Sequence, residues 1–250
     1  MELGEDVGPA LVLQAPVLDL AEHRLTGLGP ASAERLLDAA VPDVPVILDA
    51  NDLHSVWVNT AALQAMEIDR STPDPVGGEI VRDDEGDATG FLLETAAMKH
   101  AWGYLEAMAS DADRDRFLEN ACNAYLETGV TGATEMSFGA ADLAAYRRRL
   151  DRDGRLPFPV NAHWILTASG SLETDLAEVA EVARLRDEVA AQCGEDWLRI
   201  AGVKFILDGV IDACTATMRA PYANGALPGP IWEREFALPV AVAADAAGLQ

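Results

Sequence analysis

Hydrophobic and polar residues follow regular patterns only in the second part of the chain, from about residue 111 onward. Apolar residues at helical spacing predict a helix over residues 111–128, with Cys122 on its apolar face. Further helices are predicted over residues 141–153, 172–192 and 235–247, and strands over residues 130–136, 159–166 and 197–207. These strands are apolar almost throughout, which is typical of a parallel sheet covered on both faces.

The first 108 residues follow a less regular pattern. Short strand-like runs occur at residues 10–13, 45–48 and 79–81, and brief helical stretches occur at residues 32–39 and 59–66. The sequence Asp83-Asp84-Glu85-Gly86 predicts the tip of a hairpin. We therefore divide the chain into an irregular region, residues 1–108, and a region of repeated β/α units, residues 109–250.

The charge of the chain excludes two classes of partner. It carries 42 acidic and 18 basic residues, a net charge of −24. Such a surface repels phosphate groups and anionic lipids, so we expect neither nucleic acids nor membranes as partners. No apolar run reaches the roughly 20 residues of a membrane-spanning helix, and no signal peptide is visible. We expect a soluble cytoplasmic protein.

Candidate chemistry lies where the predicted strands end, because functional residues of parallel α/β folds gather at the carboxyl ends of strands. The three strands bring Glu135, His163 and Lys204 toward that end, and Asp208 follows the third. His163 fits either a hydrogen-bonded core residue or a functional one. Glu135 fits either acid–base or metal chemistry, or an ion pair with an arginine. No glycine-rich phosphate loop follows a strand, which argues against a nucleotide-binding sheet.

Lys204 is unusual because it lies inside an apolar strand, where an ammonium group loses its hydration. Three interpretations remain open from the residues alone. The lysine can be structural, reaching solvent or pairing with a carboxylate such as Glu135. It can form a Schiff base, since burial lowers the pKa of an amine. It can also react with carbon dioxide and become a carbamate that bridges two metal ions.

A polar and aromatic segment at residues 51–59 follows the strand-like run at residues 45–48. It places His54, Trp57 and Asn59 close together in the sequence. One interpretation is a turn that caps the helix beginning near Asn59. The other is a loop that faces substrate, because polar and aromatic groups converge in binding loops.

Four segments together resemble the YtcJ-like group of amidohydrolases, which includes N-substituted formamide deformylases. They are LDAAVPDVPVILDANDLHSVWVNTAAL, GGEIVRDDEGDATGFLLETA, GVTGATEM and LRIAGVKFILDGVIDACTATMRAPYANG, in the order of the family. The resemblance covers about residues 36–250. It implies an α/β fold with a partial (β/α)8 TIM barrel, about strands two to four with their helices, plus an irregular α+β insertion. Residues 1–108 would be that insertion, lying over the active site, and residues 109–250 the partial barrel.

The resemblance also implies a chemistry. The parent enzyme would hydrolyse non-peptide, amide-type carbon–nitrogen bonds with water activated by a divalent metal, expected to be zinc. Lys204, in the fourth barrel strand, would be a carboxylated lysine that bridges the metals. Glu135 would contact the metal ligands rather than the metals themselves. The residues expected to bind the small-molecule substrate are His54, Trp57, Asn59, His163 and Asp208.

The sequence departs from the family in its metal ligands. The first strand of the family carries a His-x-His pair, and no such pair occurs among the four histidines of this chain. We therefore expect a central fragment that is inactive alone and binds no catalytic metal, because several ligands must hold a catalytic zinc ion. We also expect self-association through open sheet edges. The alternatives are a non-catalytic α/β assembly domain and a lyase that uses Lys204 as its nucleophile.

Overall fold

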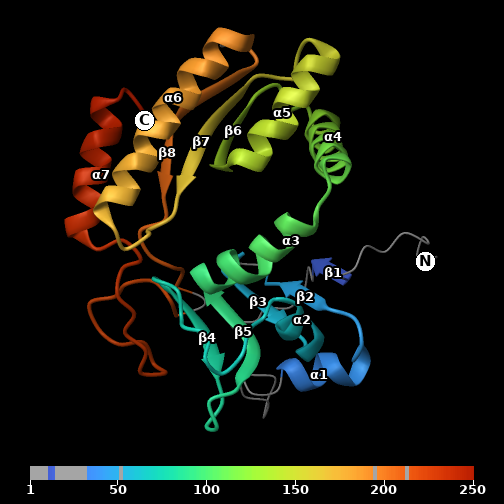
Figure 1. The fold of residues 1–250 in the computed structure, drawn as a ribbon, viewed down its shortest axis with the longest axis vertical. Helices are drawn as coiled ribbons and strands as arrows, with labels where there is room; N and C mark the ends of the chain where they lie inside the picture. The colour runs from blue at the N-terminus through green and yellow to red at the C-terminus, as the bar shows by residue number, and fades with distance from the viewer. Residues whose placement is uncertain (1–10, 15–32, 51–52, 194–195, 212–213) are drawn as a thin grey trace. The chain divides into compact units, whose positions relative to one another are not determined.

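The computed structural model describes residues 11–14, 33–50, 53–193, 196–211 and 214–250. The chain divides into two compact units, each described by itself here (Figure 1). Unit 1 comprises Met1–Ala107 and Leu207–Ile231, and unit 2 comprises Met108–Ile206 and Trp232–Gln250. Leu207–Ile231, which belongs to the predicted barrel region, thus packs with unit 1. The functional roles assigned to residues 1–108 and 109–250 stay predictions.

Unit 1 contains a five-stranded sheet with the order β1-β2-β3-β5-β4. Its strands are β1 (Leu11–Gln14), β2 (Val46–Asp49), β3 (Ser55–Val58), β4 (Gly78–Arg82) and β5 (Ala88–Glu94). β1 pairs in parallel with β2, and the other neighbours pair antiparallel. The sequence pattern predicts β1, β2 and β4 but misses β3 and β5. The described part of residues 1–108 therefore combines a sheet with helices.

Among the described residues of this part of the chain, four short helical elements accompany the sheet. They are α1 (Ala33–Ala40), α2 (Thr60–Ala65), the π-helix η2 (Ala97–Trp102) and α3 (Gly103–Met108). An apolar cluster joins β2, β3, β4 and β5 to α2 and η2. Its fully buried members include Ile47, Val56, Val58, Ala62, Leu92, Ala97 and Ala101. The predicted hairpin is confirmed, because residues 83–87 connect β4 to β5.

Unit 2 contains a parallel three-stranded sheet with the order β6-β7-β8. Its strands are β6 (Ala133–Phe138), β7 (Val160–Leu166) and β8 (Leu198–Phe205), and its helices are α4 (Asp111–Glu127), α5 (Ala140–Asp153), α6 (Leu172–Cys193) and α7 (Arg234–Ala246). Each strand lies beside the next one in the sequence, with a helix in each crossover. The predicted helices and strands of this region are confirmed, although β6 begins at Ala133 rather than at residue 130.

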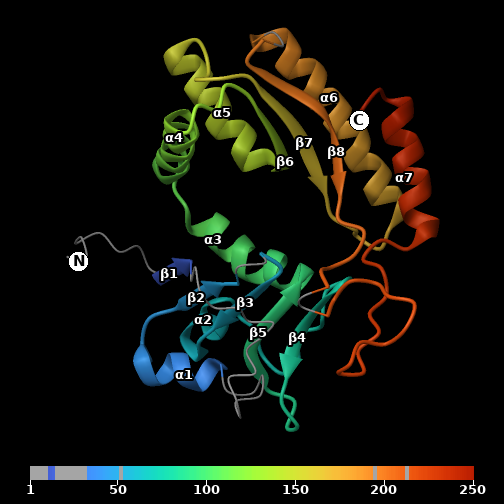
Figure 2. The ribbon, with the colours of Figure 1, turned by 180° about the vertical axis from the view of Figure 1, so that it is seen from behind.

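Helices cover one face of this sheet, which Figures 1 and 2 view from opposite sides. Phe138 of β6 packs against Tyr146 of α5 and Trp164 of β7, with ring centroids 5.7 and 6.0 Å apart. Along β7, every second residue is buried and those between are partly exposed. Within the described residues, the second face of β7 is therefore only partly covered, whereas the sequence pattern predicts that both faces are covered. This second face carries Asn161 and His163.

The last residue of the chain pairs with the outer edge of β8. The Gln250 N–H donates to the Ala201 carbonyl at 3.1 Å, and the Gln250 carbonyl accepts from the Val203 N–H at 2.9 Å. This alternation is the bonding pattern of a parallel neighbour. Gly202 permits the approach, because a Cβ at that position would lie 2.1 Å from the Gln250 carbonyl oxygen.

Local capping explains where the helices of unit 2 begin and end. The Ser110 hydroxyl accepts a hydrogen bond from the Asp113 N–H, and the Asp113 carboxylate accepts one from the Ser110 N–H, so α4 begins with a capping box. α5 ends at Gly154, whose φ of 69° is the left-handed conformation that glycine adopts at low cost.

Arg148 of α5 joins α4 through Asp115, with its Nη2 atom 2.7 Å from Asp115 Oδ1. The hydrogen bond from Arg148 holds the pKa of Asp115 below its usual range. Because folding lowers this pKa, the pair stabilises the folded state above the unfolded pKa of about 4, and its effect disappears as pH falls through the folded value. We expect Asp115→Asn to lower the free energy of unfolding at pH 7 by less than about 1 kcal/mol.

Urea unfolding measures this difference. The gap between Asp115→Asn and the parent chain, measured at pH 7 and at acid pH, should close as the pH falls through the lowered pKa of Asp115 in the folded state. In an Arg148→Met background, Asp115→Asn should have no effect at either pH. An equal loss of stability in both backgrounds would show that the two side chains act independently.

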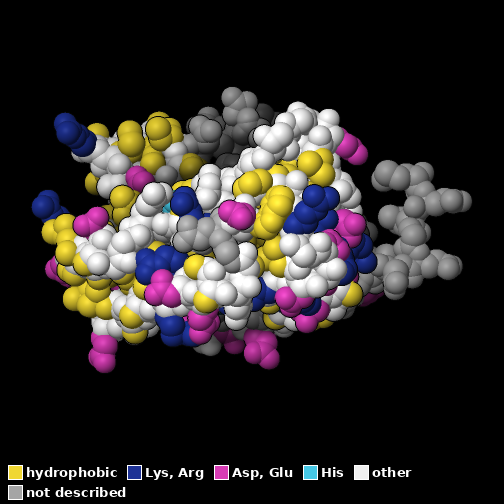
Figure 3. All heavy atoms as spheres, turned by 90° about the horizontal axis from the view of Figure 1, so that it is seen from above, with side chains coloured by type: hydrophobic (Ala, Val, Ile, Leu, Met, Phe, Trp, Pro, Cys, Tyr) yellow, Lys and Arg dark blue, Asp and Glu magenta, His cyan; other side chains and the backbone are white. Residues whose placement is uncertain are grey.

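The surface of the described residues mixes charged and apolar side chains, which are interspersed on the face shown in Figure 3. On α4, Cys122 is buried as predicted, whereas Phe117 and Tyr125 of the same predicted apolar face are 57 and 53 % exposed. Self-association through such surfaces or through sheet edges stays a prediction. None of the helices in the described part of the chain is both long and apolar enough to cross a bilayer.

Candidate functional site

Lys204 lies near the carboxyl end of β8, on the face of the unit 2 sheet that the helices leave uncovered. In the parallel register Lys204 pairs with Ile165, and Gly202 pairs with His163. Since paired residues of neighbouring strands share a face, and alternate residues of one strand share a face, Lys204 and His163 point to the same side. Asn161 lies on this side as well, two residues before His163.

The side chains of this face are incompletely paired. Lys204 is partly exposed, and within unit 2 no described carboxylate forms an ion pair with it. The Nδ1 atom of His163 is buried and has no hydrogen-bond partner among the described residues. Most buried polar atoms are satisfied, so such an atom calls for an explanation. The structural interpretation of Lys204 as half of an ion pair with Glu135 is therefore not supported.

Glu135 lies on the other side of the sheet. It pairs in register with Ala162, whose side chain is buried under the helices, and one of its carboxylate oxygens accepts the Ser137 N–H at 2.8 Å. The register of β6 shifts directly after Glu135. This geometry places Glu135 away from Lys204 and His163, which leaves its predicted supporting role without a structural basis in unit 2.

A second constellation lies in unit 1, around a buried carboxylate that the sequence reasoning missed. Glu94, the last residue of β5, is 6 % exposed. Its Oε2 atom lies 2.8 Å from His54 Nδ1, and its backbone N–H donates to the His54 carbonyl at 2.7 Å. His54 directly precedes β3, which pairs with β5. The sheet therefore holds the predicted substrate residue His54 against a carboxylate by both side chain and backbone.

The segment after β8 reaches the same carboxylate. The Thr215 hydroxyl contacts Glu94 Oε1 and accepts the Val210 N–H at 3.0 Å. Gly209 lies so close that a Cβ there would be 2.3 Å from Glu94 Oε1. The neighbouring Asp208 accepts the Thr217 N–H at 3.0 Å. Of the predicted substrate residues, unit 1 thus brings His54 and the turn that carries Asp208 to one buried group.

Asn59 has a structural role. It is fully buried, and its Oδ1 atom accepts the N–H groups of Ala62 and Val46, both at 2.9 Å. Its Nδ2 group donates to the carbonyls of Val41 and Val44, both at 2.8 Å. The capping interpretation of this residue is confirmed, and no exposed atom supports its predicted contact with substrate.

Trp57 lies on β3 and packs edge-on against Phe91, with ring centroids 6.1 Å apart. It is partly exposed, and its indole Nε1 atom is buried without a hydrogen-bond partner among the described residues. Its predicted role in substrate binding stays a prediction. Asn51 and Asp52 of the same sequence segment lie outside the described residues.

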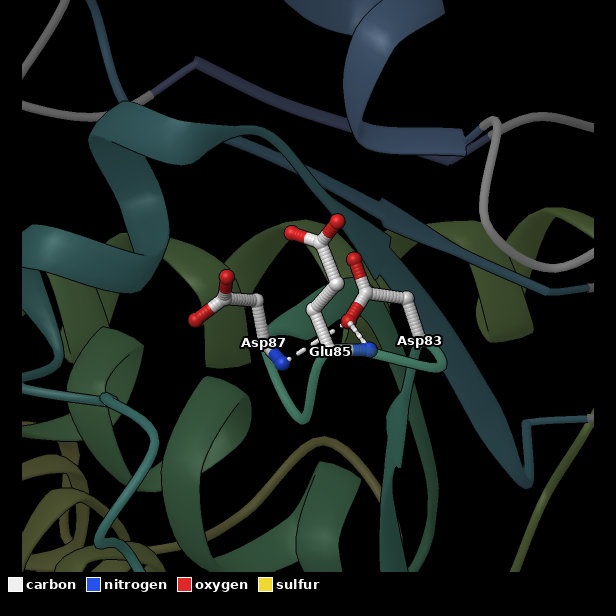
Figure 4. A group of neighbouring side chains, drawn as sticks. All are labelled: Asp83, Glu85 and Asp87. Carbon is white, nitrogen blue, oxygen red and sulfur yellow. Dashed lines mark hydrogen bonds between the residues drawn. The ribbon is translucent and has the colours of Figure 1, made fainter.

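Three carboxylates meet at the hairpin tip between β4 and β5, where Asp83, Glu85 and Asp87 can bring ligand atoms within 4.8 Å of one another (Figure 4). Asp83 Oδ1 accepts the N–H groups of both Glu85 and Asp87 at 2.9 Å, which closes the turn. Asp87 also pairs with Arg70 at 2.6 Å. Turn formation and this exposed ion pair account for the arrangement, so it carries no functional assignment.

Several sequence relatives match the chain. The sequence model described as the amidohydrolase family matches residues 20–250. The exoenzymes regulatory protein AepA of Pectobacterium carotovorum is 27 % identical over 82 % of this chain and 42 % of its own length. The N-substituted formamide deformylase of Arthrobacter pascens is 38 % identical over 49 % of this chain and 23 % of its own length. The putative amidohydrolase YtcJ of Bacillus subtilis is 30 % identical over 75 % of this chain and 33 % of its own length.

The fold is also similar to that of solved structures. An uncharacterised metal-dependent hydrolase from Pyrococcus horikoshii superposes with a TM-score of 0.56 at 22 % identity, over 87 % of this chain and 40 % of that protein. At this identity the likeness concerns the fold. The chain spans less than half the length of each of these relatives.

Proposed function

Because the chain belongs to the amidohydrolase family, we propose that it is part of a metal-dependent hydrolase that cleaves non-peptide, amide-type carbon–nitrogen bonds. The observation that carries the proposal is the placement of Lys204. It shares the uncovered face of a parallel sheet with the Nδ1 atom of His163, which has no hydrogen-bond partner among the described residues. The similarity to a protein named N-substituted formamide deformylase supports the amide class of substrate.

We further propose that unit 2 is part of a (β/α)8 barrel. Three observations support this proposal: the strands follow one another in sequence order, helices cover only one face, and Gln250 pairs with β8 as a next parallel strand would. In a closed barrel the second face becomes the interior. Lys204 would then lie near the end of the barrel at which the active sites of such enzymes are found.

The proposed metal is a divalent ion such as zinc. Lys204 would hold it after its amine nitrogen forms a bond to carbon dioxide and loses a proton, which creates a carbamate with two ligand oxygens. Among the residues that the structure describes, the one group of three metal-ligating side chains is the hairpin tip at Asp83, and none surrounds Lys204. The described residues therefore do not fit a complete metal centre. The remaining ligands would come from further polypeptide, and the isolated chain would be inactive.

The residues of unit 1 would serve substrate recognition. His54 is about a quarter exposed, so its imidazole can contact a bound molecule while Glu94 holds it from behind. An amide substrate offers a carbonyl acceptor and, in a secondary amide, an N–H donor, and an imidazole can bond either of them. Asp208 and Trp57 remain candidates for the same task.

Metal removal tests the proposed function. We expect the full-length polypeptide to release the amine from an N-substituted formamide. Treatment with a chelator should abolish the release, and added zinc should restore it, because metal-activated water is the nucleophile of such hydrolases. The 250-residue chain alone should release no amine above the uncatalysed rate. Undiminished turnover after verified metal removal would exclude a metal-dependent hydrolase, and turnover by the isolated chain would exclude the proposed need for further ligands.

A further inference from the structure

The carboxylate of Glu94 joins two segments that are far apart in the sequence of unit 1. One oxygen meets His54 beside β3, and the other meets Thr215 in the segment after β8, 121 residues away. With 6 % of its surface exposed, Glu94 has little water to compensate its charge. A buried carboxylate is stabilised as an anion by surrounding hydrogen-bond donors, and the side chains of His54 and Thr215 contact it here.

The hydrogen positions follow from this geometry. The Thr215 hydroxyl accepts the Val210 N–H at 3.0 Å, and its own proton can go to Glu94 Oε1, the nearer acceptor, or to the Val210 carbonyl at 3.2 Å. His54 Nδ1 lies 2.8 Å from Glu94 Oε2, and a carboxylate in its ionised form can only accept, so with that form the shared hydrogen is on Nδ1. In the neutral ring Nε2 is then the acceptor atom. Glu94 thus fixes both the tautomer and the orientation of the imidazole.

Positive φ angles occur at Glu94 and at the residues directly before its two side-chain partners. Four described non-glycine residues have positive φ, and three of them are Leu53 at 58°, Glu94 at 51° and Cys214 at 58°. Leu53 directly precedes His54, and Cys214 directly precedes Thr215. Residues with a side chain rarely adopt this conformation, and it persists where the surroundings over-determine it, often at functional sites. The positive φ angles of Leu53, Glu94 and Cys214 therefore point to an arrangement that is held by its surroundings.

The space between the Glu94 carboxylate and Gly209 is also too small for another side chain. A Cβ at Gly209 would lie 2.3 Å from both Glu94 Oε1 and Thr215 Oγ1, and 2.6 Å from Thr215 Cβ. The turn that follows Asp208 therefore fits over Glu94 only because residue 209 has no side chain. This contact locates Asp208 relative to His54 within unit 1.

We propose that Glu94 is a positioning residue, which holds His54 in its Nδ1–H tautomer for contact with the substrate and pins the Asp208–Gly209 turn through Thr215. This inference rests on the proposed function, because the substrate is the amide-type molecule that His54 would meet. Glu94 itself touches no substrate. Its role resembles that of any carboxylate that orients a histidine from behind.

Nitrogen NMR of the histidine rings in the 250-residue chain tests the positioning, with His54→Gln used to assign the His54 signals. The parent chain should show a fixed Nδ1–H tautomer for His54. Glu94→Met, which has similar length but offers no acceptor, should release the ring into exchange between both tautomers. Glu94→Gln can present its carbonyl to His54 and its amide group to Thr215, so it should retain the Nδ1–H form.

Thr215→Val is the matched control, because it removes the other bond to Glu94 and leaves His54 untouched. It should keep the Nδ1–H tautomer. An Nε2–H tautomer in the parent chain would overturn the proposal even if a variant failed to fold. A fixed tautomer in Glu94→Met would overturn it too, as would a change in Thr215→Val as large as that in Glu94→Met, which would indicate general loosening.

Kinetics of the full-length polypeptide then separate the two proposals. We expect Glu94→Met to lower kcat/KM for the formamide by roughly 10- to 100-fold, the range for residues that orient a functional histidine. Adding His54→Gln should cause little further loss, because the two residues act as one unit. If the parent enzyme hydrolyses the amide and Glu94→Met does so equally well, the positioning role of Glu94 is refuted, whereas the proposed hydrolase function is retained. If the parent hydrolyses no amide, the function fails, whatever the NMR shows.

Discussion

Replacing Lys204 by methionine is expected to abolish hydrolysis by the full-length polypeptide. Methionine keeps the length and apolar stem of lysine on β8 but cannot form the proposed carbamate. The loss in kcat/KM should be on the order of a thousandfold, since a catalytic metal contributes several kcal/mol and about 1.4 kcal/mol corresponds to a factor of ten in rate. The measurements are amine release and bound metal per chain, and both should fall together.

The chain offers a matched control, because its second lysine, Lys99, is exposed on η2. Lys99→Met should leave amine release unchanged. In the full-length polypeptide supplied with 13C-labelled bicarbonate, a carbamate carbon signal should persist in Lys99→Met and vanish in Lys204→Met. Full activity of Lys204→Met would refute the bridging role. A reduced substrate adduct trapped on Lys204 with borohydride would instead favour Schiff-base chemistry.

The largest effect on stability is expected at Asn59. Asn59→Ala removes four hydrogen bonds, which hold residues 41–46 and the first turn of α2, in a fully buried position. Loss of a helix cap costs about 1 kcal/mol, and each buried group left without a partner adds about 1 to 3 kcal/mol before relaxation. We expect a decrease of about 3 kcal/mol or more in the free energy of unfolding, measured with urea on the 250-residue chain.

Two other variants calibrate this result. Asn59→Asp keeps the acceptor for Ala62 and Val46 but loses the donors, so its decrease should be intermediate. Gln64→Ala changes an exposed residue of the same helix and should alter the free energy of unfolding by less than about 0.5 kcal/mol. Equal stability of Asn59→Ala and the parent chain would mean that these hydrogen bonds contribute nothing beyond those made to water.

The sequence predicts the helices of unit 2 well because their signals are local. Ser110 and Asp113 mark the start of α4, and Gly154 marks the end of α5, within a few residues of each boundary. β3 and β5 are harder to predict. β3 has only four residues and follows a polar stretch, and β5 contains Gly90. Their strand character depends on pairing with each other, which no local pattern reveals.

The residues of the candidate site also differ in whether the sequence alone reveals them. Lys204 is detectable because a charged residue inside an apolar run stands out, and the same rule applied to Glu94 at the end of GFLLE would have identified it as well. Thr215 is not detectable, because a single threonine between polar and small residues has no distinctive pattern. Its contact with Glu94 arises from tertiary structure alone.

The interval of 121 residues between Glu94 and Thr215 has a consequence for biosynthesis. A ribosome that adds about 5 to 20 residues per second needs roughly 6 to 25 s to proceed from one to the other. During that time the nascent β3–β5 sheet exists without the hydroxyl that completes its carboxylate pocket, and all of α4, α5 and α6 is translated meanwhile. Unit 1 therefore cannot finish folding in the order of synthesis. Its last step waits for a late segment of chain.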